Sequence, residues 1–159
     1  MPSKQRQTAN KLVEAFNALD VPTILSLRTP NCLRTILPSS LNQPSSNNEA
    51  YLAQLNLMKT VFRSFQVTVN DVIEGISDTD GRVKIIMYVS ARGETPAGEY
   101  RNEYVWKMGF DEDGEKISEW SEYVDANMAR NFYPKLMEVV KRQREEDVEN
   151  LEQKGGDVN

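Results

Sequence analysis

The sequence contains no histidine and a single cysteine, Cys32. The first absence excludes catalytic triads and dyads that use an imidazole base, and it excludes metal and haem sites with histidine ligands. One cysteine can form neither an intrachain disulfide nor a zinc site built from several thiolates. Without an imidazole nearby, the Cys32 thiol lacks the usual base that would make it a nucleophile. Proton transfer near neutral pH would therefore fall to carboxylates, Tyr, Lys or Arg.

Long apolar runs and an excess of positive charge are also missing. No stretch approaches the roughly 18 apolar residues of a membrane helix, and residues 1–10 are too polar for a signal peptide. The formal net charge is −5, which disfavours partners bound through phosphates, such as nucleic acids. We therefore expect a cytoplasmic protein with no nucleic-acid or membrane partner. Its 159 residues are enough for a single domain of ordinary size.

The N-terminal part of the chain has the period of helices. Apolar residues recur every three or four positions from Ala9 to Leu19, and Pro22 stands near the start of a second short helix. A stretch rich in Pro, Ser and Asn then interrupts the pattern and predicts a loop. The expected elements are helices at residues 9–19, 23–27 and 49–65, a strand at 32–37 and a loop at 38–48.

After Phe65 the period changes from 3.6 to 2, and Gly-containing turn sequences divide the chain into strands. The expected strands, at residues 66–75, 82–91, 99–110 and 116–125, form an antiparallel meander. A last helix is expected at 126–152, with Pro134 at a kink or boundary. We therefore predict an α+β domain over residues 1–140, followed by a charged helix end and tail at 141–159.

Strand parity predicts which side chains face the interior, because successive residues point to opposite faces of a sheet. In the strand at 99–110 one parity carries charges, so we expect the other, aromatic parity to point inward. Its members are Tyr100, Asn102, Tyr104, Trp106, Met108 and Phe110. In the next strand, Trp120 and Val124 share a parity with Glu122 and would place this carboxylate inward. Arg34 shares the parity of Cys32 in the strand at 32–37 and is expected inward too.

These side chains form a chemically sensible set. Burial between apolar residues would raise the pKa of Glu122 toward neutrality, where a carboxyl group can act as acid or base. Arg34 could pair with this carboxylate, hold a substrate oxygen, or do both. The candidate catalytic residues are Glu122, Arg34, Tyr104 and Tyr100. The candidate substrate-binding residues are Tyr88, Trp106, Asn102, Trp120 and Tyr51.

Each candidate also has a purely structural interpretation. Tyr100 and Tyr104 can be core residues whose hydroxyls simply find a partner. Glu122 faces solvent or a dimer interface if the parity is shifted by one residue. Arg34 can serve only to neutralise Glu122 as a buried pair. Asp125 stands directly before the last helix, where an N-cap role is at least as good an interpretation as catalysis.

The order of elements and the segment Lys116–Asp125, KISEWSEYVD, resemble the SnoaL-like branch of the NTF2-like superfamily over nearly the whole chain to about residue 137. The segments Leu33–Ser40, LRTILPSS, and Glu103–Met108, EYVWKM, are similar to fungal enzymes of secondary metabolism. That clade includes meroterpenoid isomerases and the brevianamide-type semipinacolase. The resemblance implies a cone in which a curved antiparallel sheet wraps over the N-terminal helices, with a C-terminal helix and a deep apolar pocket. It also implies a homodimer formed through the sheet.

The residues and the resemblance together predict a cofactor-independent isomerase or cyclase in fungal secondary metabolite biosynthesis. Its substrate would be a bulky, apolar natural-product intermediate, changed by a semipinacol-type rearrangement, an isomerisation or an epimerisation. Glu122 would move a proton, while Arg34 and the phenols stabilise the atom on which charge develops. We expect neither a cofactor nor a metal. The alternative is a non-catalytic NTF2-like module for small-molecule binding or dimerisation.

Overall fold

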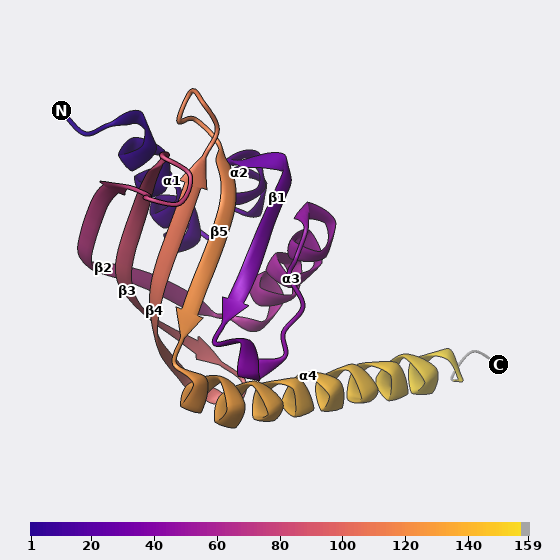
Figure 1. Cartoon of the computed structure of the whole chain (residues 1–159). Helices are drawn as coiled ribbons and strands as arrows, with labels where there is room; N and C mark the ends of the chain where they lie inside the picture. Colours follow the sequence, from indigo (N-terminus) through magenta and orange to yellow (C-terminus); the bar gives the residue numbers. More distant parts are fainter. Residues whose placement is uncertain (157–159) are drawn as a thin grey trace.

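The computed structural model describes residues 1–156 as a five-stranded sheet with three helices on one face and a fourth across its end (Figure 1). The helices are α1 (Lys4–Asn17), α2 (Val21–Ser26), α3 (Asn48–Val61) and α4 (Ala126–Gly155), with a short 3₁₀-helix at Ser39–Leu41. The strands are β1 (Arg28–Leu37), β2 (Ser64–Ile76), β3 (Val83–Thr95), β4 (Gly98–Phe110) and β5 (Ile117–Val124). This order of elements confirms the α+β class expected from the sequence.

The strands lie side by side in the order β1–β5–β4–β3–β2. From β2 to β5 they form the antiparallel meander that the turn sequences predicted. β1 differs, because it pairs with β5 in parallel and places Arg34 beside Trp120 and Ile36 beside Glu122. A parallel pair needs a long connection, which α3 and the meander supply here. The sheet is therefore mixed, whereas we expected an antiparallel one.

The hydrophobic core fills the space between the concave face of the sheet and α1 to α3. The ring of Phe16 on α1 lies 6.3, 5.6 and 5.9 Å from the ring centroids of Phe65, Trp106 and Trp120, respectively. Alternate residues of β3 and β4 are buried, as their period of two predicted. The buried residues of β4 include Tyr100, Asn102, Trp106, Met108 and Phe110. The parity assigned to this strand from the sequence is thus confirmed.

The junction between α3 and β2 differs from the expected boundary. The helix ends at Val61, and Phe65, which we expected near its end, lies in β2 opposite Gly93. The backbone N–H of Arg63 already donates to the carbonyl of Glu94, at 2.9 Å. The backbone after Val61 thus forms its hydrogen bonds with β3, where a longer helix would have formed them within its next turn.

The last helix starts at an N-cap and runs without interruption. The Asp125 carboxylate accepts hydrogen bonds from the backbone N–H groups of Asn127 and Met128, at 3.0 and 3.3 Å, which confirms the capping interpretation. α4 continues through Pro134, so this proline does not end the helix, and the domain boundary expected at residue 140 falls inside it. Residues 157–159 of the expected tail lie outside the described residues. Within residues 1–156, no helix combines the length and the apolar character needed to cross a membrane.

Gly93 of β3 lies opposite Phe65, at the start of β2. A Cβ atom on Gly93 would lie 2.4 Å from the backbone oxygen of Ser64 and 2.7 Å from the ring of Phe62. We expect Gly93→Ala to lower the free energy of unfolding by about 1–3 kcal/mol, because backbone would have to move. Gly75→Ala is the matched control, since a Cβ there meets no atom within 4 Å. Urea unfolding measures both variants, and equal stabilities would contradict the prediction.

Candidate functional site

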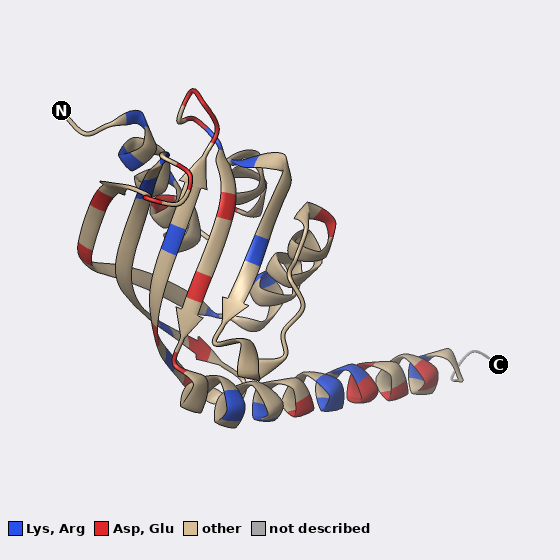
Figure 2. Cartoon of the chain, in the orientation of Figure 1, with Lys and Arg blue, Asp and Glu red and all other residues tan. Residues whose placement is uncertain are grey.

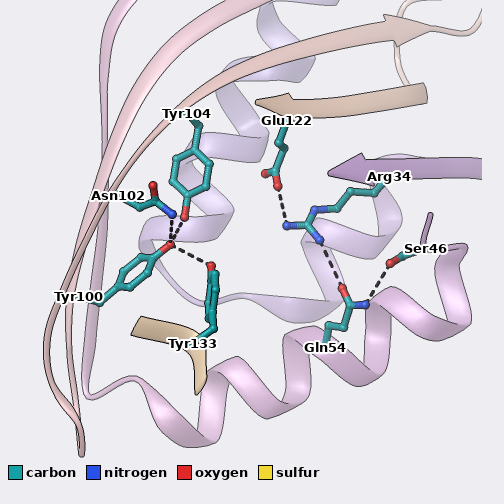
Figure 3. A network of polar contacts seen from close by, with 8 residues as sticks. All are labelled: Arg34, Ser46, Gln54, Tyr100, Asn102, Tyr104, Glu122 and Tyr133. Carbon is teal, nitrogen blue, oxygen red and sulfur yellow. Dashed lines mark hydrogen bonds and ion pairs between the residues drawn. The ribbon is translucent and has the colours of Figure 1, made fainter. Parts of the chain in front are cut away.

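A buried ion pair joins the two parallel strands of the sheet (Figure 3). Arg34 of β1 donates from Nη2 to Oε2 of Glu122 on β5, at 2.5 Å. The Glu122 side chain is 3% exposed and that of Arg34 is 19% exposed, so water screens this pair very little. Arg34 Nη1 also donates to Oε1 of Gln54 on α3, and Gln54 Nε2 donates to Oγ of Ser46. The guanidinium is therefore held from both sides, by a strand and by a helix.

Burial and the ion pair act on the pKa of Glu122 in opposite directions. Burial raises the pKa of Glu122 above its ordinary value, and the Arg34 charge only partly offsets that rise. The indole N–H of Trp106 also favours the charged carboxylate, although its geometry falls short of a hydrogen bond. Burial would lower the pKa of Arg34, but the Glu122 charge raises it above the ordinary value. Arg34 is thus a permanent cation beside a carboxyl group that is more basic than usual.

A cluster of phenols lies next to this pair, where Tyr133 of α4 approaches Tyr100 and Tyr104 of β4 (Figure 3). The Tyr100 hydroxyl contacts the hydroxyls of Tyr104 and, at 3.0 Å, of Tyr133 on α4. It also accepts a hydrogen bond from Nδ2 of Asn102, at 3.0 Å. Burial raises the pKa of Tyr100 and of Tyr104 well above their ordinary values. Both phenols therefore stay protonated and can donate hydrogen bonds at neutral pH.

A second buried arginine, Arg28, extends the network. It donates from Nε to Oδ1 of Asn48 at 2.7 Å, and its guanidinium lies 4.6 Å from the ring centroid of Tyr51. The guanidinium of Arg34 lies 5.0 Å from that same ring and 5.4 Å from the ring of Trp120. Burial lowers the pKa of Arg28 below its ordinary value. Two cations thus share one aromatic wall on the side of the interior formed by β1 and α3.

The structure brings together eight of the nine residues selected from the sequence. The candidate binding residues Trp106, Asn102, Trp120 and Tyr51 are buried on the inner side. Asn102 also has a structural role, because its Oδ1 accepts from the backbone N–H of Asp125 and anchors the start of α4. The assignment of Tyr88 to the site is wrong.

Tyr88 is 44% exposed and lies on the outer face of the sheet. Its neighbours Met87 and Val89 are buried, so alternation along β3 turns Tyr88 outward. Arg28 and Tyr133 are not among the residues predicted from the sequence. Arg28 is buried like Cys32, but a register shift in β1 between Arg28 and Leu33 breaks the alternation, so strand parity would not have identified it. Nothing in the sequence pattern around Tyr133 distinguishes it, because its contact depends on how α4 crosses the sheet.

Some hydrogen-bond donors of the interior have no acceptor within residues 1–156. Four buried N–H groups have no partner among the described residues: Arg28 Nη1, Arg34 Nε, Trp106 Nε1 and Trp120 Nε1. A buried donor without an acceptor typically costs about 1–3 kcal/mol, so such groups are seldom left unpaired. A bound molecule that carries carbonyl, hydroxyl or ether oxygens would satisfy them. The chemistry of the site therefore suits a ligand that is apolar in bulk but bears oxygen acceptors.

Two hollows of the surface lie away from this network. One, of about 560 Å³, is lined by residues at the start of β2 and near the end of β3, including Gln66, Arg92 and Glu94. The other, of about 360 Å³, lies beside α4 at Lys141, Arg144 and Val148. Neither is lined by Arg34 or Glu122. Within the described part of the chain, no three acidic or cysteine side chains gather closely enough to hold a metal ion.

Solved structures share this architecture, although no family model matches the sequence. BvnE pinacolase from Penicillium brevicompactum has a TM-score of 0.75 at 20% identity, covering 83% of this chain and 90% of that one. An NTF2-like protein from Burkholderia pseudomallei has a TM-score of 0.67 at 17% identity, covering 83% and 99%. This chain has the NTF2-like fold. AusH from Aspergillus nidulans shares this fold with a TM-score of 0.68 at 27% identity, covering 79% of this chain and 88% of AusH.

Related sequences come from fungal biosynthesis clusters. Austinoid biosynthesis cluster protein H of Aspergillus calidoustus is 28% identical over 120 residues, which are 75% of this chain and 81% of that protein. A protein of Aspergillus aculeatus named monooxygenase AacuP is 26% identical over 141 residues, or 89% and 94% of the two chains. The NTF2-like fold and these similarities agree with the resemblance recognised in the sequence.

Arg34→Gln would leave a buried carboxylate without its cation in this NTF2-like fold. An uncompensated buried charge costs on the order of 3–5 kcal/mol, and we expect that loss of unfolding free energy near neutral pH. The folded-state pKa of Glu122 is already raised by burial and rises further without Arg34. The penalty therefore grows as pH rises from the ordinary pKa of a glutamate to that raised folded-state pKa, is complete above it, and shrinks as pH falls and the carboxyl group is protonated in both states.

Urea unfolding at a series of pH values measures this effect. The double variant Arg34→Gln/Glu122→Gln is the matched control, because it buries no charge and should recover most of the lost stability. A stability gap between Arg34→Gln and the unchanged protein that does not narrow on acidification would show that the ion pair is not the cause.

Proposed function

We propose that this protein is a cofactor-independent isomerase or cyclase that rearranges a bulky, mostly apolar intermediate of fungal secondary metabolism. The observation that carries the proposal is the buried Arg34–Glu122 pair, which lies beside two protonated phenols. Together, the pair and the phenols provide a base, a cation and neutral hydrogen-bond donors inside an aromatic interior. The names of similar proteins, a pinacolase and members of austinoid biosynthesis clusters, support this class of reaction.

The proposed roles follow from the charges. The Glu122 carboxylate accepts the proton of a substrate hydroxyl, and its raised pKa makes it a better base than an exposed glutamate. In a semipinacol rearrangement, the electron pair of that O–H bond forms a carbonyl while a neighbouring C–C bond migrates to the adjacent electron-poor carbon. Arg34 and Tyr104 donate hydrogen bonds to the substrate atom on which negative charge gathers. The same groups can move a proton in an isomerisation or an epimerisation.

The walls of the site define the substrate class that we propose. Trp106, Trp120 and Tyr51 present broad aromatic surfaces, which suit a polycyclic, largely apolar skeleton. The N–H groups of the two tryptophans and the Nε–H of Arg34 have no partner elsewhere in residues 1–156 and could donate hydrogen bonds to oxygen atoms on that skeleton. Asn102 and Tyr100 position Tyr104 and the start of α4.

The alternative is a non-catalytic module that binds a small molecule or only dimerises. Two observations favour it. The ring of Trp120 packs edge to face against the rings of Tyr51 and Trp106, with centroid distances of 5.8 and 5.3 Å. The two hollows of about 560 and 360 Å³ are also lined by other residues. In that case the Arg34–Glu122 pair would only specify the fold.

Mass spectrometry separates these functions with one set of incubations. The purified protein is incubated with a panel of oxidised indole alkaloids and meroterpenoid intermediates, and each product is compared with its starting compound by liquid chromatography. A product of unchanged mass and altered retention time supports an isomerase. A product heavier by one oxygen would instead indicate a monooxygenase, the activity in the name of AacuP. A compound that is retained by the protein but unchanged would indicate the binding module.

Glu122→Gln tests the role of the carboxylate in any turnover found. We expect the rate to fall by about 100-fold or more, because the amide cannot accept the proton. Glu103→Gln is the matched control, since Glu103 lies on β4 with its side chain exposed on the outer face. Circular dichroism checks that both variants keep the fold. Full activity of Glu122→Gln would remove Glu122 from the mechanism.

We further propose that the protein is a homodimer formed through the outer face of the sheet. Apolar residues cross this face from strand to strand, since Val105 pairs with both Tyr88 and Tyr123, and Tyr123 pairs with Leu37. Tyr88 and Tyr123 are 44% and 56% exposed. A row of large apolar side chains on an open sheet is typical of a surface that another protein chain covers.

Tyr123→Arg tests this interface, because it places a charge in the middle of the apolar row. We expect the dissociation constant for self-association to rise by about tenfold or more in sedimentation equilibrium. Leu52→Arg is the control, since Leu52 is 41% exposed on α3, on the other side of the sheet. Equal self-association of the two variants would argue against a dimer through the sheet.

A further inference from the structure

The second half of α4 extends away from the rest of the protein (Figure 1). The helix has 30 residues, but Leu136 is its only buried residue, and every residue from 141 to 156 is exposed. A single helix of about 15 residues is only marginally stable in water when nothing packs against it. The length of α4 therefore points to a packing partner that the isolated chain does not supply.

One side of this projecting helix is apolar. Met137, Val140, Val148 and Leu151 lie within an arc of about 80° when each residue turns the helix by about 100°. Met137, Val148 and Leu151 are 42%, 54% and 71% exposed. Met137 and Val148 are eleven residues apart, and so are Val140 and Leu151. A spacing of eleven residues returns to nearly the same side of a helix, so the four side chains form one stripe.

The charges of this segment are divided along its length (Figure 2). Residues 141–144, Lys-Arg-Gln-Arg, carry three positive charges, and residues 145–149, Glu-Glu-Asp-Val-Glu, carry four negative ones. Ion pairs within the helix use only part of them, at Arg142–Glu138 and Lys141–Glu145. The change of sign falls between residues 144 and 145, at the middle of the apolar stripe.

We propose that the α4 helices of two copies of this chain pair in antiparallel orientation, centred on Arg144. This arrangement places Met137 of each copy against Leu151 of the other and Val140 against Val148. It also places the basic run of each helix opposite the acidic run of the other, with Lys141 on the same edge of the seam as Glu145 of the other copy. Parallel pairing would instead put like charges side by side. The pairing depends on α4 alone and goes beyond both the proposed reaction and the proposed contact through the sheet.

Arg144 fits this arrangement as the polar residue that fixes the register. It interrupts the apolar stripe at its midpoint, and a single polar residue in such a seam favours one alignment at some cost in stability. Each Arg144 would have Glu145 and Asp147 of the opposite helix within reach, so the two cations at the centre are surrounded by acidic side chains. A shift by one helical turn would separate Met137 from Leu151 and misalign the charged runs.

Single cysteines in the full-length protein test the orientation directly. Cys32 is fully buried, so an introduced cysteine on α4 is the accessible thiol. We expect Arg144→Cys to form a disulfide-linked dimer under mild oxidation, because residue 144 meets its own copy at the centre. Met137→Cys alone should not link, since its two copies would lie about 21 Å apart, too far for a disulfide. A mixture of Met137→Cys and Leu151→Cys should link.

Glu146→Cys is the matched control, because Glu146 lies on the opposite side of the helix from Arg144 and is also exposed. Adding Leu151→Asp to Arg144→Cys should lower the linked fraction to that of this control. Linkage of Met137→Cys with itself would show parallel helices and overturn the proposal. Equal linkage of Arg144→Cys and Glu146→Cys would overturn it as well, since collisions alone would explain that result. The proposed dimer through the sheet is a separate contact. If it does not form, the same pattern of disulfide linkage between α4 helices is still expected.

Discussion

The ion pair between Arg34 and Glu122 is the interaction on which the interior of this protein depends. A carboxylate with 3% exposure is tolerated in an aromatic core only if a cation lies against it. Parallel pairing of β1 with β5 supplies that cation, because the register sets Arg34 and Glu122 two residues apart on neighbouring strands. The chain segment that follows β1 then places Gln54 against the same guanidinium, and Gln54 in turn donates a hydrogen bond to Ser46. Topology and electrostatics thus support each other.

The same pair explains how an acid group can act as a base in this environment. Burial alone disfavours the charged form of Glu122, whereas Arg34 favours it, and the raised pKa of Glu122 reflects the balance of both effects. The neighbouring phenols have the opposite character. Tyr100 and Tyr104 are kept neutral by burial, so they donate hydrogen bonds without adding charge. The site therefore combines one proton acceptor with several fixed donors.

Much of this arrangement follows from the period of two along the strands. Parity predicted Glu122 and Trp120 on the inner face, because Trp120 and Val124, two residues to either side of Glu122, are apolar. The same rule applied to β3 would have turned Tyr88 outward, since Ile85, Met87 and Val89 are the buried residues. This rule does not predict the partner of Arg34 on α3 or the contact of Tyr133 with Tyr100. Both contacts depend on how helices distant in sequence pack on the sheet, and local sequence patterns do not predict that packing.

The hydrogen-bonding capacity of Arg34 links stability to the proposed chemistry. One terminal nitrogen, Nη2, binds Glu122 and the other, Nη1, binds Gln54, while Nε is buried without a partner. A planar guanidinium can thus hold the carboxylate and still donate to a substrate oxygen, which an ammonium group at the same place could not do with fixed geometry. If Arg34 served only to neutralise Glu122, the buried Nε and the nearby indole N–H of Trp120 would remain an uncompensated cost. Binding of an oxygen-bearing molecule would remove that cost, which supports the proposed role of the pair in binding as well as in folding.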